Sequence, residues 1–191
     1  IVVSRHDKTR PIDHIFVCES MIDAASHYQM KLAGSSKNLL YISTEGNITQ
    51  GQMEVIKLLL NKQNINDIPN QLTYIFDNDK NGYKYALKLD SFLKGVEMNI
   101  ENMSSDELKE KVLQLPNVDL SVESDWNDDL RAGLKKNSEI VFSEAAKSND
   151  FTKLAGLKAE GYSPSPEVLK QLKSSVPVQT MIAVQKIFGL P

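Results

Sequence analysis

Two aspartates spaced one residue apart follow a run of strand-forming residues, and this stretch has the clearest chemical potential in the chain. Thr73–Phe76 favours a buried strand, Asp77 and Asp79 come directly after it, and Gly82 closes the polar turn. Because side chains alternate along an extended chain, the two carboxylates are expected on the same side. Two acids at one strand end repel each other unless a cation lies between them, and hard divalent ions prefer oxygen ligands. The spacing therefore predicts a divalent-cation site.

A third acid follows another predicted strand. Ile15–Cys18 is apolar, Glu19 comes next, and Ser20 carries a helix-start signal. If the two strands are neighbours in one sheet, Glu19 reaches the same edge as the aspartates. The three acids would then converge on one edge of the sheet, where a divalent cation could bind them.

The elements around these acids alternate between strand and helix patterns, and helix-start signals lie at Ser20, Thr49 and Ser104. Such alternation predicts an α/β fold, with a Rossmann-like parallel sheet of about four strands flanked by helices. Ligands bind such sheets at the carboxyl ends of the strands. The predicted strands are Ile15–Cys18, Leu39–Ser43, Thr73–Phe76 and Val96–Ile100, with Ile1–Val3 as an edge strand, and a helix is predicted over Gly82–Leu93.

The character of the sequence changes near Ser138, after which no strand pattern remains. We therefore predict an α/β domain over residues 1–137 and a small helical extension or linker subdomain over 138–191. The predicted helices of this second part are Phe142–Lys147, Phe151–Leu157, Pro166–Leu172 and Val178–Phe188.

Composition excludes several classes of protein. The 191 residues are 41% hydrophobic and 25% charged, which is typical of a soluble globular protein, and a cytoplasmic location is the default expectation. No apolar run is long enough to span a membrane. One cysteine and three histidines exclude the usual zinc ligand sets, so any metal must be held by oxygen. The net charge of -3 means that nucleic-acid binding would rest on local basic patches.

Three alternative motifs fail at defined positions. A calcium loop that begins at Asp77 needs glutamate at its twelfth position, where Lys88 stands. Gly46–Gly51 has the glycine spacing of a phosphate-binding loop, but Gln52 and Met53 replace the required lysine and hydroxyl residue. Phosphatases with an aspartyl nucleophile usually carry their Asp-x-Asp on the first strand, whereas this pair follows a later one.

Three motifs taken together resemble a Toprim domain, most closely those of bacterial primases and of plasmid or transposon mobilisation proteins. In chain order they are Glu19-Ser-Met-Ile-Asp23, Asp77-Asn-Asp79-Lys-Asn-Gly82 and Asp125-Trp-Asn127. The resemblance covers roughly residues 12–134. It implies that Glu19 acts as general acid or base, and that Asp77 and Asp79 hold magnesium or manganese, an ion that Glu19 could share.

The resemblance also implies a function. We expect magnesium-dependent nucleotidyl transfer of the primase type, within a relaxase-associated plasmid mobilisation protein or a replication protein. DNA, either single-stranded or as primer–template, and nucleotides would be the substrates. Because the chain starts without methionine, other domains of a larger protein are expected partners. A Toprim-type nuclease that uses the same carboxylates, and a module that binds nucleic acid or protein without catalysis, remain open alternatives.

Several polar residues near the motifs have two interpretations each. The aspartates of the Asp-x-Asp could cap the next helix instead of binding metal. Asp23 could cap its own helix or face the site. Asp125 and Asn127 could cap a helix from Trp126 or orient water on the metal. Four basic residues could contact phosphate or lie on solvated helix faces, namely Lys80, Lys84, Lys88 and Arg131.

Overall fold

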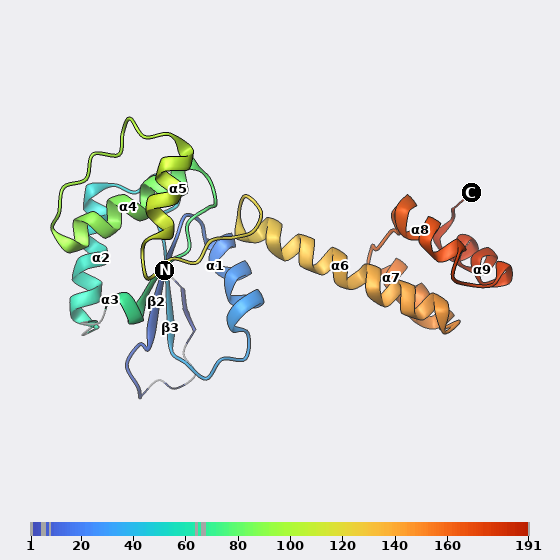
Figure 1. The fold of residues 1–191 in the computed structure, drawn as a ribbon. Coiled ribbons are helices and arrows are strands. Elements are labelled where there is room, and N and C mark those ends of the chain that lie inside the picture. Colours follow the sequence, from blue (N-terminus) through green and yellow to red (C-terminus); the bar gives the residue numbers. More distant parts are fainter. Residues whose placement is uncertain (1, 5–6, 8, 64, 66–67, 191) are drawn as a thin grey trace. The chain divides into compact units, whose positions relative to one another are not determined.

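The computed structural model of the chain describes residues 2–4, 7, 9–63, 65 and 68–190. The chain divides into two compact units, Ile1–Leu130 and Arg131–Pro191. Both are drawn in Figure 1, and each is described here by itself. The first unit contains the acids singled out above.

A four-stranded sheet forms the centre of the first unit, in the order β1-β3-β2-β4. Strand β2 pairs in parallel with β3 on one side and with β4 on the other, while β1 pairs antiparallel with β3. The α/β prediction is confirmed, but the parallel part has three strands and not four. The bounds are β1 Val2–Ser4, β2 His14–Cys18, β3 Leu39–Ser43 and β4 Leu72–Tyr74.

Helices cover both faces of this sheet (Figure 1). On one face, Phe16 of β2 and Tyr41 of β3 pack with Ala24 of α1 and with Trp126. On the other face, the alternate strand residues form a larger core with α2, α4 and α5. The period of two along each strand explains this division. The helices are α1 Met21–His27, its π-helical continuation η1 Tyr28–Leu32, α2 Gln50–Lys62, α3 Ile68–Gln71, α4 Lys80–Lys94 and α5 Ser105–Leu113.

Side-chain caps begin these helices where the sequence predicts them. Thr49 forms a reciprocal capping box at α2, and Ser104 forms one at α5. Ser20 accepts a hydrogen bond from the backbone of Asp23 at the start of α1. Helix α4 starts two residues earlier than expected, because Asp79 caps it. Local capping chemistry therefore fixes where the chain turns from each strand edge into the next helix.

The predicted strand Val96–Ile100 is wrong. This segment has no regular structure, and Val96 and Met98 are 53% and 39% exposed while Ile100 is buried. The free edge of β4 is taken instead by a later segment, because Tyr74 bridges to Val118 in parallel. That position beside β4 is therefore not available to the 96–100 segment.

The second unit is helical, and the helix that leads into it is much longer than the sequence predicts. Helix α6, Trp126–Lys147, is a single element of 22 residues, so the separate helix predicted over Phe142–Lys147 is wrong. The sequence between the two predicted helices is polar but contains no proline, so the helix continues through it. The remaining helices are α7 Phe151–Ala159, α8 Pro166–Lys173 and α9 Val178–Phe188, packed around Phe142, Leu154, Leu172 and Val184.

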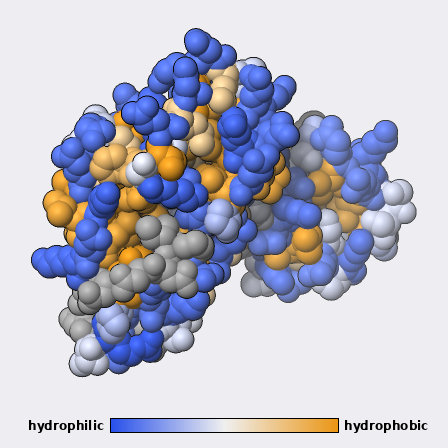
Figure 2. All heavy atoms as spheres, turned by 60° about the vertical axis from the view of Figure 1, so that its left-hand side comes forward, coloured by the Kyte–Doolittle hydropathy of each residue, from blue (hydrophilic) through white to orange (hydrophobic). Residues whose placement is uncertain are grey.

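Hydrophobic side chains lie among hydrophilic ones on the surface of the first unit (Figure 2). On helix α2, Val55 and Leu58 are 53% and 66% exposed. Within the described residues, no helix has the length and apolar character needed to cross a bilayer.

Candidate active site at the carboxyl ends of the parallel strands

The two strands that precede the predicted catalytic acids are direct neighbours. Glu19 follows the last residue of β2, and Asp77 follows β4 after the buried residues Ile75 and Phe76. Because β2 and β4 are parallel, both carboxylates lie at the same edge of the sheet. Asp77 and Glu19 are close enough for each to shift the pKa of the other, and the charge of Asp79 acts on both. The structure therefore brings the three acids together.

The loop after β3 holds the backbone of Glu19 in place. The Glu19 carbonyl oxygen accepts hydrogen bonds from Ser43 Oγ and from the Gly46 backbone N–H, each at 3.1 Å. The loop turns sharply here, since Glu45 has a φ of 52° and Gly46 has a φ of 100°. The third parallel strand thus positions the first acid without contributing a carboxylate of its own to the three.

The two aspartates of the Asp-x-Asp have different surroundings. Asp79 Oδ1 accepts hydrogen bonds from the backbone N–H groups of Asn81 and Gly82, both at 2.8 Å, so Asp79 is the N-cap of α4. Asp77 Oδ1 is buried and has no hydrogen-bond partner in the described part of the chain. A buried carboxylate oxygen without a partner is costly, because its interaction with water is lost and not replaced. Capping therefore explains Asp79 in part but leaves Asp77 unexplained.

Gly82 permits the backbone of Asp77 to approach α4. A Cβ atom added at Gly82 would collide with the carbonyl oxygen of Asp77 and would lie 2.8 Å from its backbone C and N atoms. No side chain fits there without moving the Asp77 backbone. The sequence analysis treated Gly82 only as a turn residue. Its place three residues after the capping aspartate, in the first turn of the helix, was the available signal.

Asn78, the residue between the two aspartates, was also missed. Its Nδ2 donates to the Ser121 carbonyl oxygen at 2.9 Å, and its backbone N–H donates to the Ser124 carbonyl oxygen at 2.9 Å. The hydroxyl of Tyr83 donates to Asn78 Oδ1. Asn78 therefore ties the loop that precedes Asp125 to the Asp-x-Asp turn. Only the three-dimensional contact reveals this role, because the partners are more than forty residues away.

Two further acids act on the three. Asp23 is 5% exposed, its carboxylate accepts a hydrogen bond from the Ser20 hydroxyl, and its backbone N–H donates to Ser20 Oγ. Asp125 Oδ1 accepts from the Asp128 backbone N–H at 2.7 Å, at the start of α6. The charges of both Asp23 and Asp125 also raise the pKa of Asp77. Each of these two aspartates therefore makes hydrogen bonds in the first turn of a helix, and each adds negative charge near Asp77.

The pKa values of three of these acids are raised above their ordinary values. Burial, followed by the charges of Asp23 and Glu19, raises the pKa of Asp77 to about 7. Burial, followed by the charges of Asp79 and Asp23, raises the pKa of Glu19. Burial also raises the pKa of Asp23. Negative charge is in excess at this edge of the sheet, and a cation would relieve it.

Tyr85 of α4 is a further residue that the sequence analysis did not assign to the site. Burial, followed by the charges of Glu19, Asp79 and Asp77, raises the pKa of its hydroxyl group. Its ring packs edge-on against Phe76, with 5.9 Å between centroids. The cap at Asp79 fixes the rotation of α4, and this was the signal that could have placed Tyr85 near the acids.

The basic residues considered for phosphate binding are not equivalent. Lys84 Nζ lies 3.5 Å and Lys88 Nζ lies 3.3 Å from the carboxylate of Glu101. Lys80 is exposed at the start of α4. Arg131 belongs to helix α6 and to the second compact unit. Two of the α4 lysines thus already have an acidic partner.

The chemistry of the donors suits a hard divalent cation, although the side chains are not closed around one. No group of three or more His, Cys, Asp or Glu side chains in the described ranges is arranged so that it could hold a metal ion. The orphaned Asp77 Oδ1 and the excess negative charge are nevertheless the features that a cation would satisfy. The residues therefore fit the group in donor type and charge.

A comparison with protein families places these observations in a known class. A family model described as Toprim-like matches residues 16–130, which include all five acids. The comparisons with curated proteins and with solved structures found no match. The family implies a metal-dependent role in which the protein acts on nucleic acid, and Toprim domains generally bind divalent metal. The match covers more than half of the chain, and the chain therefore belongs to the Toprim-like family.

Proposed function

We propose that this chain carries out divalent-metal-dependent nucleotidyl transfer of the primase type, in DNA mobilisation or replication. The observation that carries the proposal is the buried, unpartnered Oδ1 of Asp77 beside Glu19 and Asp79, at the carboxyl ends of two neighbouring parallel strands. Buried polar groups without partners are rare, and at a functional site they commonly mark the place of a ligand or ion.

Asp77 and Asp79 would hold the ion, which would be magnesium or manganese. When bound, such an ion neutralises the charge that develops on phosphate oxygens. Asp79 keeps its capping bonds through Oδ1, which leaves Oδ2 as the oxygen assigned to the ion. Because the cap fixes the Asp79 side chain, α4 would also orient this ligand.

Glu19 would move the proton. In nucleotidyl transfer a 3′ hydroxyl attacks the α-phosphorus of a nucleotide, pyrophosphate leaves, and the hydroxyl proton needs an acceptor. A carboxylate with a raised pKa is a better acceptor than an ordinary glutamate, since general bases work best near the operating pH. Asp23, Asp125 and Asn127 would orient water around the ion, and Lys80, Lys84, Lys88 and Arg131 would contact the phosphate backbone.

Two assays of the full chain test this proposal. With magnesium or manganese, we expect primer synthesis from nucleotides on a single-stranded template, and no nicking of a supercoiled plasmid under the same conditions. Asp77→Asn should reduce synthesis at least about 100-fold, because it removes a charged ligand. In the matched control, Asp106→Asn changes an exposed aspartate in the first turn of α5 and should leave the rate within about 2-fold.

A thermal-melting measurement separates loss of the ion from loss of the fold. Magnesium should raise the melting temperature of the unmodified chain and of Asp106→Asn, but not that of Asp77→Asn. Nicking in place of synthesis would replace the proposal with the Toprim-type nuclease. Absence of both activities, with no metal-dependent stabilisation, would leave only a module that binds nucleic acid or another protein.

A further inference from the structure

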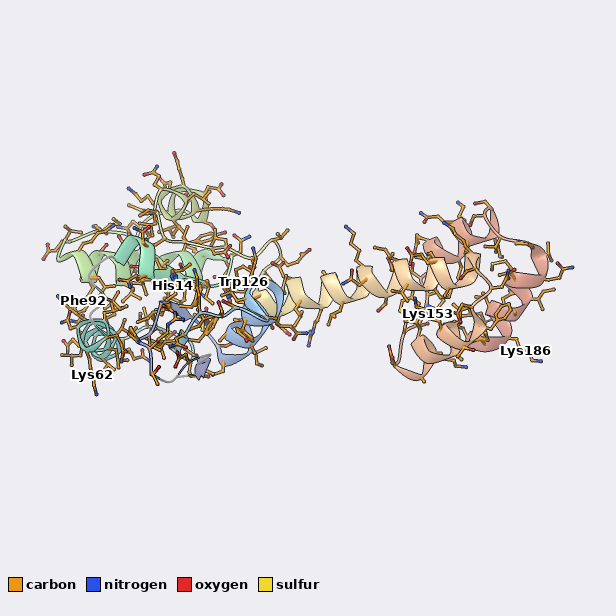
Figure 3. The ribbon with its side chains drawn as sticks, turned by 90° about the horizontal axis from the view of Figure 1, so that it is seen from below. His14, Lys62, Phe92, Trp126, Lys153 and Lys186 are labelled. Carbon is orange, nitrogen blue, oxygen red and sulfur yellow. The ribbon has the colours of Figure 1, made fainter. Side chains whose placement is uncertain are left out.

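A cavity lies at the opposite end of the sheet from the acids. It has a volume of about 310 Å³ and is lined at the amino ends of the parallel strands by His14 of β2, Leu39 of β3 and Thr73 of β4. Lys31, Lys37 and Asp119 also line it. Figure 3 labels His14 in the first unit, and Trp126 at the start of α6. We name this cavity the amino-end pocket.

The amino-end pocket is separate from the carboxylate site. Strand β2 runs from His14 to Cys18, and Glu19 follows it. Five steps of about 3.3 Å each put the two ends about 16 Å apart. Whatever binds in the pocket therefore does so without touching the acids or an ion held by them.

Two lysines supply positive charge to the pocket. Lys31 Nζ lies 3.7 Å from Asp119 Oδ2 and 5.4 Å from the centroid of the Trp126 ring. Lys37 is exposed, and its side chain makes no ion pair with any residue that the structure describes. Lys31 lies on the π-helical turn η1, a rare geometry that is often found at functional sites. The pocket thus has one lysine paired with Asp119 and one lysine without an ion pair among the described residues, although the charge of Lys37 also acts on Asp13.

The rest of the lining is mainly neutral. His14 Nε2 lies 2.8 Å from Thr73 Oγ1, and burial followed by the charge of Lys37 lowers the pKa of His14. The lowered pKa favours the neutral form of His14, so this ring adds no positive charge to that of the two lysines. Phe16 packs against the His14 ring, with 4.6 Å between centroids, and Leu32, Pro116 and Val118 add apolar wall. This surface suits a planar, uncharged ring.

We propose that the amino-end pocket binds one nucleotide unit, with its base against the apolar wall and its phosphate near Lys31 and Lys37. The volume of about 310 Å³ lies at the small end of ligand pockets and suits a mononucleotide. A bare phosphate would leave the apolar wall uncovered, and an apolar ligand would leave the lysines without an anion. A free nucleotide and the terminal nucleotide of a strand share this chemistry. The proposal needs no metal, so it does not depend on the function proposed for the acids.

Fluorescence of the single tryptophan reports on this pocket, because Lys31 lies over the Trp126 ring. Titrations of the full chain are made in EDTA, with calorimetry as an independent readout. We expect saturable binding of a nucleoside monophosphate that is at least about 10-fold tighter than that of inorganic phosphate. A short 5′-phosphorylated single strand distinguishes the sources, since it should bind as well as the nucleotide only if the pocket accepts strand ends.

Charge variants locate the binding. Lys37→Glu should weaken nucleotide binding at least about 10-fold, while Lys62→Glu, at an exposed lysine of α2, should not change it. Asp119→Asn should tighten binding several-fold, because it removes the acid that competes for Lys31. Asp77→Asn should have no effect in EDTA. Equal binding of inorganic phosphate, no response to Lys37→Glu, loss of binding in Asp77→Asn, or no saturable binding at all would each overturn the proposal.

Discussion

The two ends of the central sheet treat buried charge in opposite ways. At the carboxyl end, burial and neighbouring acids raise the pKa of Asp77 to about 7. At the amino end, burial opposes ionisation of Asp119, but the hydrogen bond with His27 and the charge of Lys31 lower its pKa. The acid at the amino end has a lysine, Lys31, as a cationic partner within the protein, whereas the acids at the carboxyl end raise one another's pKa. The carboxyl end, where the negative charges have no cationic partner, is suited to bind a cation. The amino end, where Asp119 is paired with Lys31, could bind a different kind of ligand.

The largest expected effect concerns chemistry at the carboxyl end. Glu19→Gln should lower the rate of metal-dependent synthesis about 10²- to 10³-fold, because a general base contributes about that much. The dependence of rate on pH should lose its acidic limb, while magnesium should still raise the melting temperature. The readout is the single-turnover rate between pH 5.5 and 9.

Glu54→Gln is the matched control for Glu19→Gln. Glu54 lies on the exposed side of α2, where it accepts a hydrogen bond from Gln50. We expect its rate to stay within about 2-fold of the unmodified chain. An unchanged pH profile in Glu19→Gln would show that the proton goes elsewhere, and Tyr85 would be the next residue to test.

The next effect concerns the backbone that carries the acids. Gly82→Ala should lower the free energy of unfolding by about 2 to 3 kcal/mol, because the new methyl group must displace the Asp77 backbone. Gly51→Ala on α2 should instead raise it by about 0.5 to 1 kcal/mol, since open space surrounds that glycine. Urea unfolding of both variants measures the difference. A Gly82→Ala variant as stable as Gly51→Ala would refute the tight packing at this end.

A smaller effect is the dependence of stability on pH. It is expected to have opposite signs for Asp77 and for Asp119, at the two ends of the sheet. The folded pKa of Asp77 lies above its unfolded value, so its stabilising contribution is present below about pH 4 and is lost as the pH rises towards about 7. Asp77→Asn in EDTA should therefore be more stable than the unmodified chain at pH 8, by roughly 1 to 2 kcal/mol after allowance for partial solvent screening.

Asp119 supplies the opposite case. Its folded pKa is lowered, so its contribution is present above the unfolded pKa of about 3.9 and is lost as the pH falls through the folded value. Asp119→Asn should therefore be slightly less stable than the unmodified chain at pH 8. Thermal melting from pH 3 to 8 measures both variants, and slopes of the same sign would remove the contrast between the ends.

The sequence predicts the strand ends well, because strand and cap signals are local. Apolar runs identify β2 and β3, and Thr49 and Ser104 mark helix starts through hydrogen bonds to residues three positions away. Contacts between distant segments leave no such local signal. The bridge from Tyr74 to Val118, which displaces the strand predicted at Val96–Ile100, is one example. Another is Asn78, whose partners lie in the loop before Asp125.

The same limit applies to the acids themselves. Spacing alone could place Asp77 and Asp79 on one side of the chain, but it could not separate their roles. The cap on α4 uses Asp79 Oδ1, while the Oδ1 of Asp77 is left buried without a partner among the described residues. Which oxygen is used depends on how closely α4 approaches the strand, and Gly82 determines that approach.

The smallest expected effect concerns two lysines of α4 that form ion pairs with Glu101 and not with the acids of the site. Lys84 and Lys88 share the carboxylate of Glu101 at 3.5 and 3.3 Å. If these lysines contact a phosphate backbone, Glu101→Gln should release them and raise affinity for a single-stranded oligonucleotide about 2- to 3-fold at low salt. Fluorescence anisotropy against salt concentration is the measurement, and the gain should vanish near 0.5 M salt as the charges are screened.

Glu97→Gln is the control, because Glu97 is exposed in the same segment and makes no ion pair within the described residues. Lys84→Gln should reduce the slope of log affinity against log salt concentration by about 1, which corresponds to one lost phosphate contact. Glu97→Gln should change neither the affinity nor this slope. If Glu101→Gln behaves like Glu97→Gln, the α4 lysines form a solvated helix face. The carboxyl end would then rely on the bound ion, and on contacts elsewhere, to attract a polyanion.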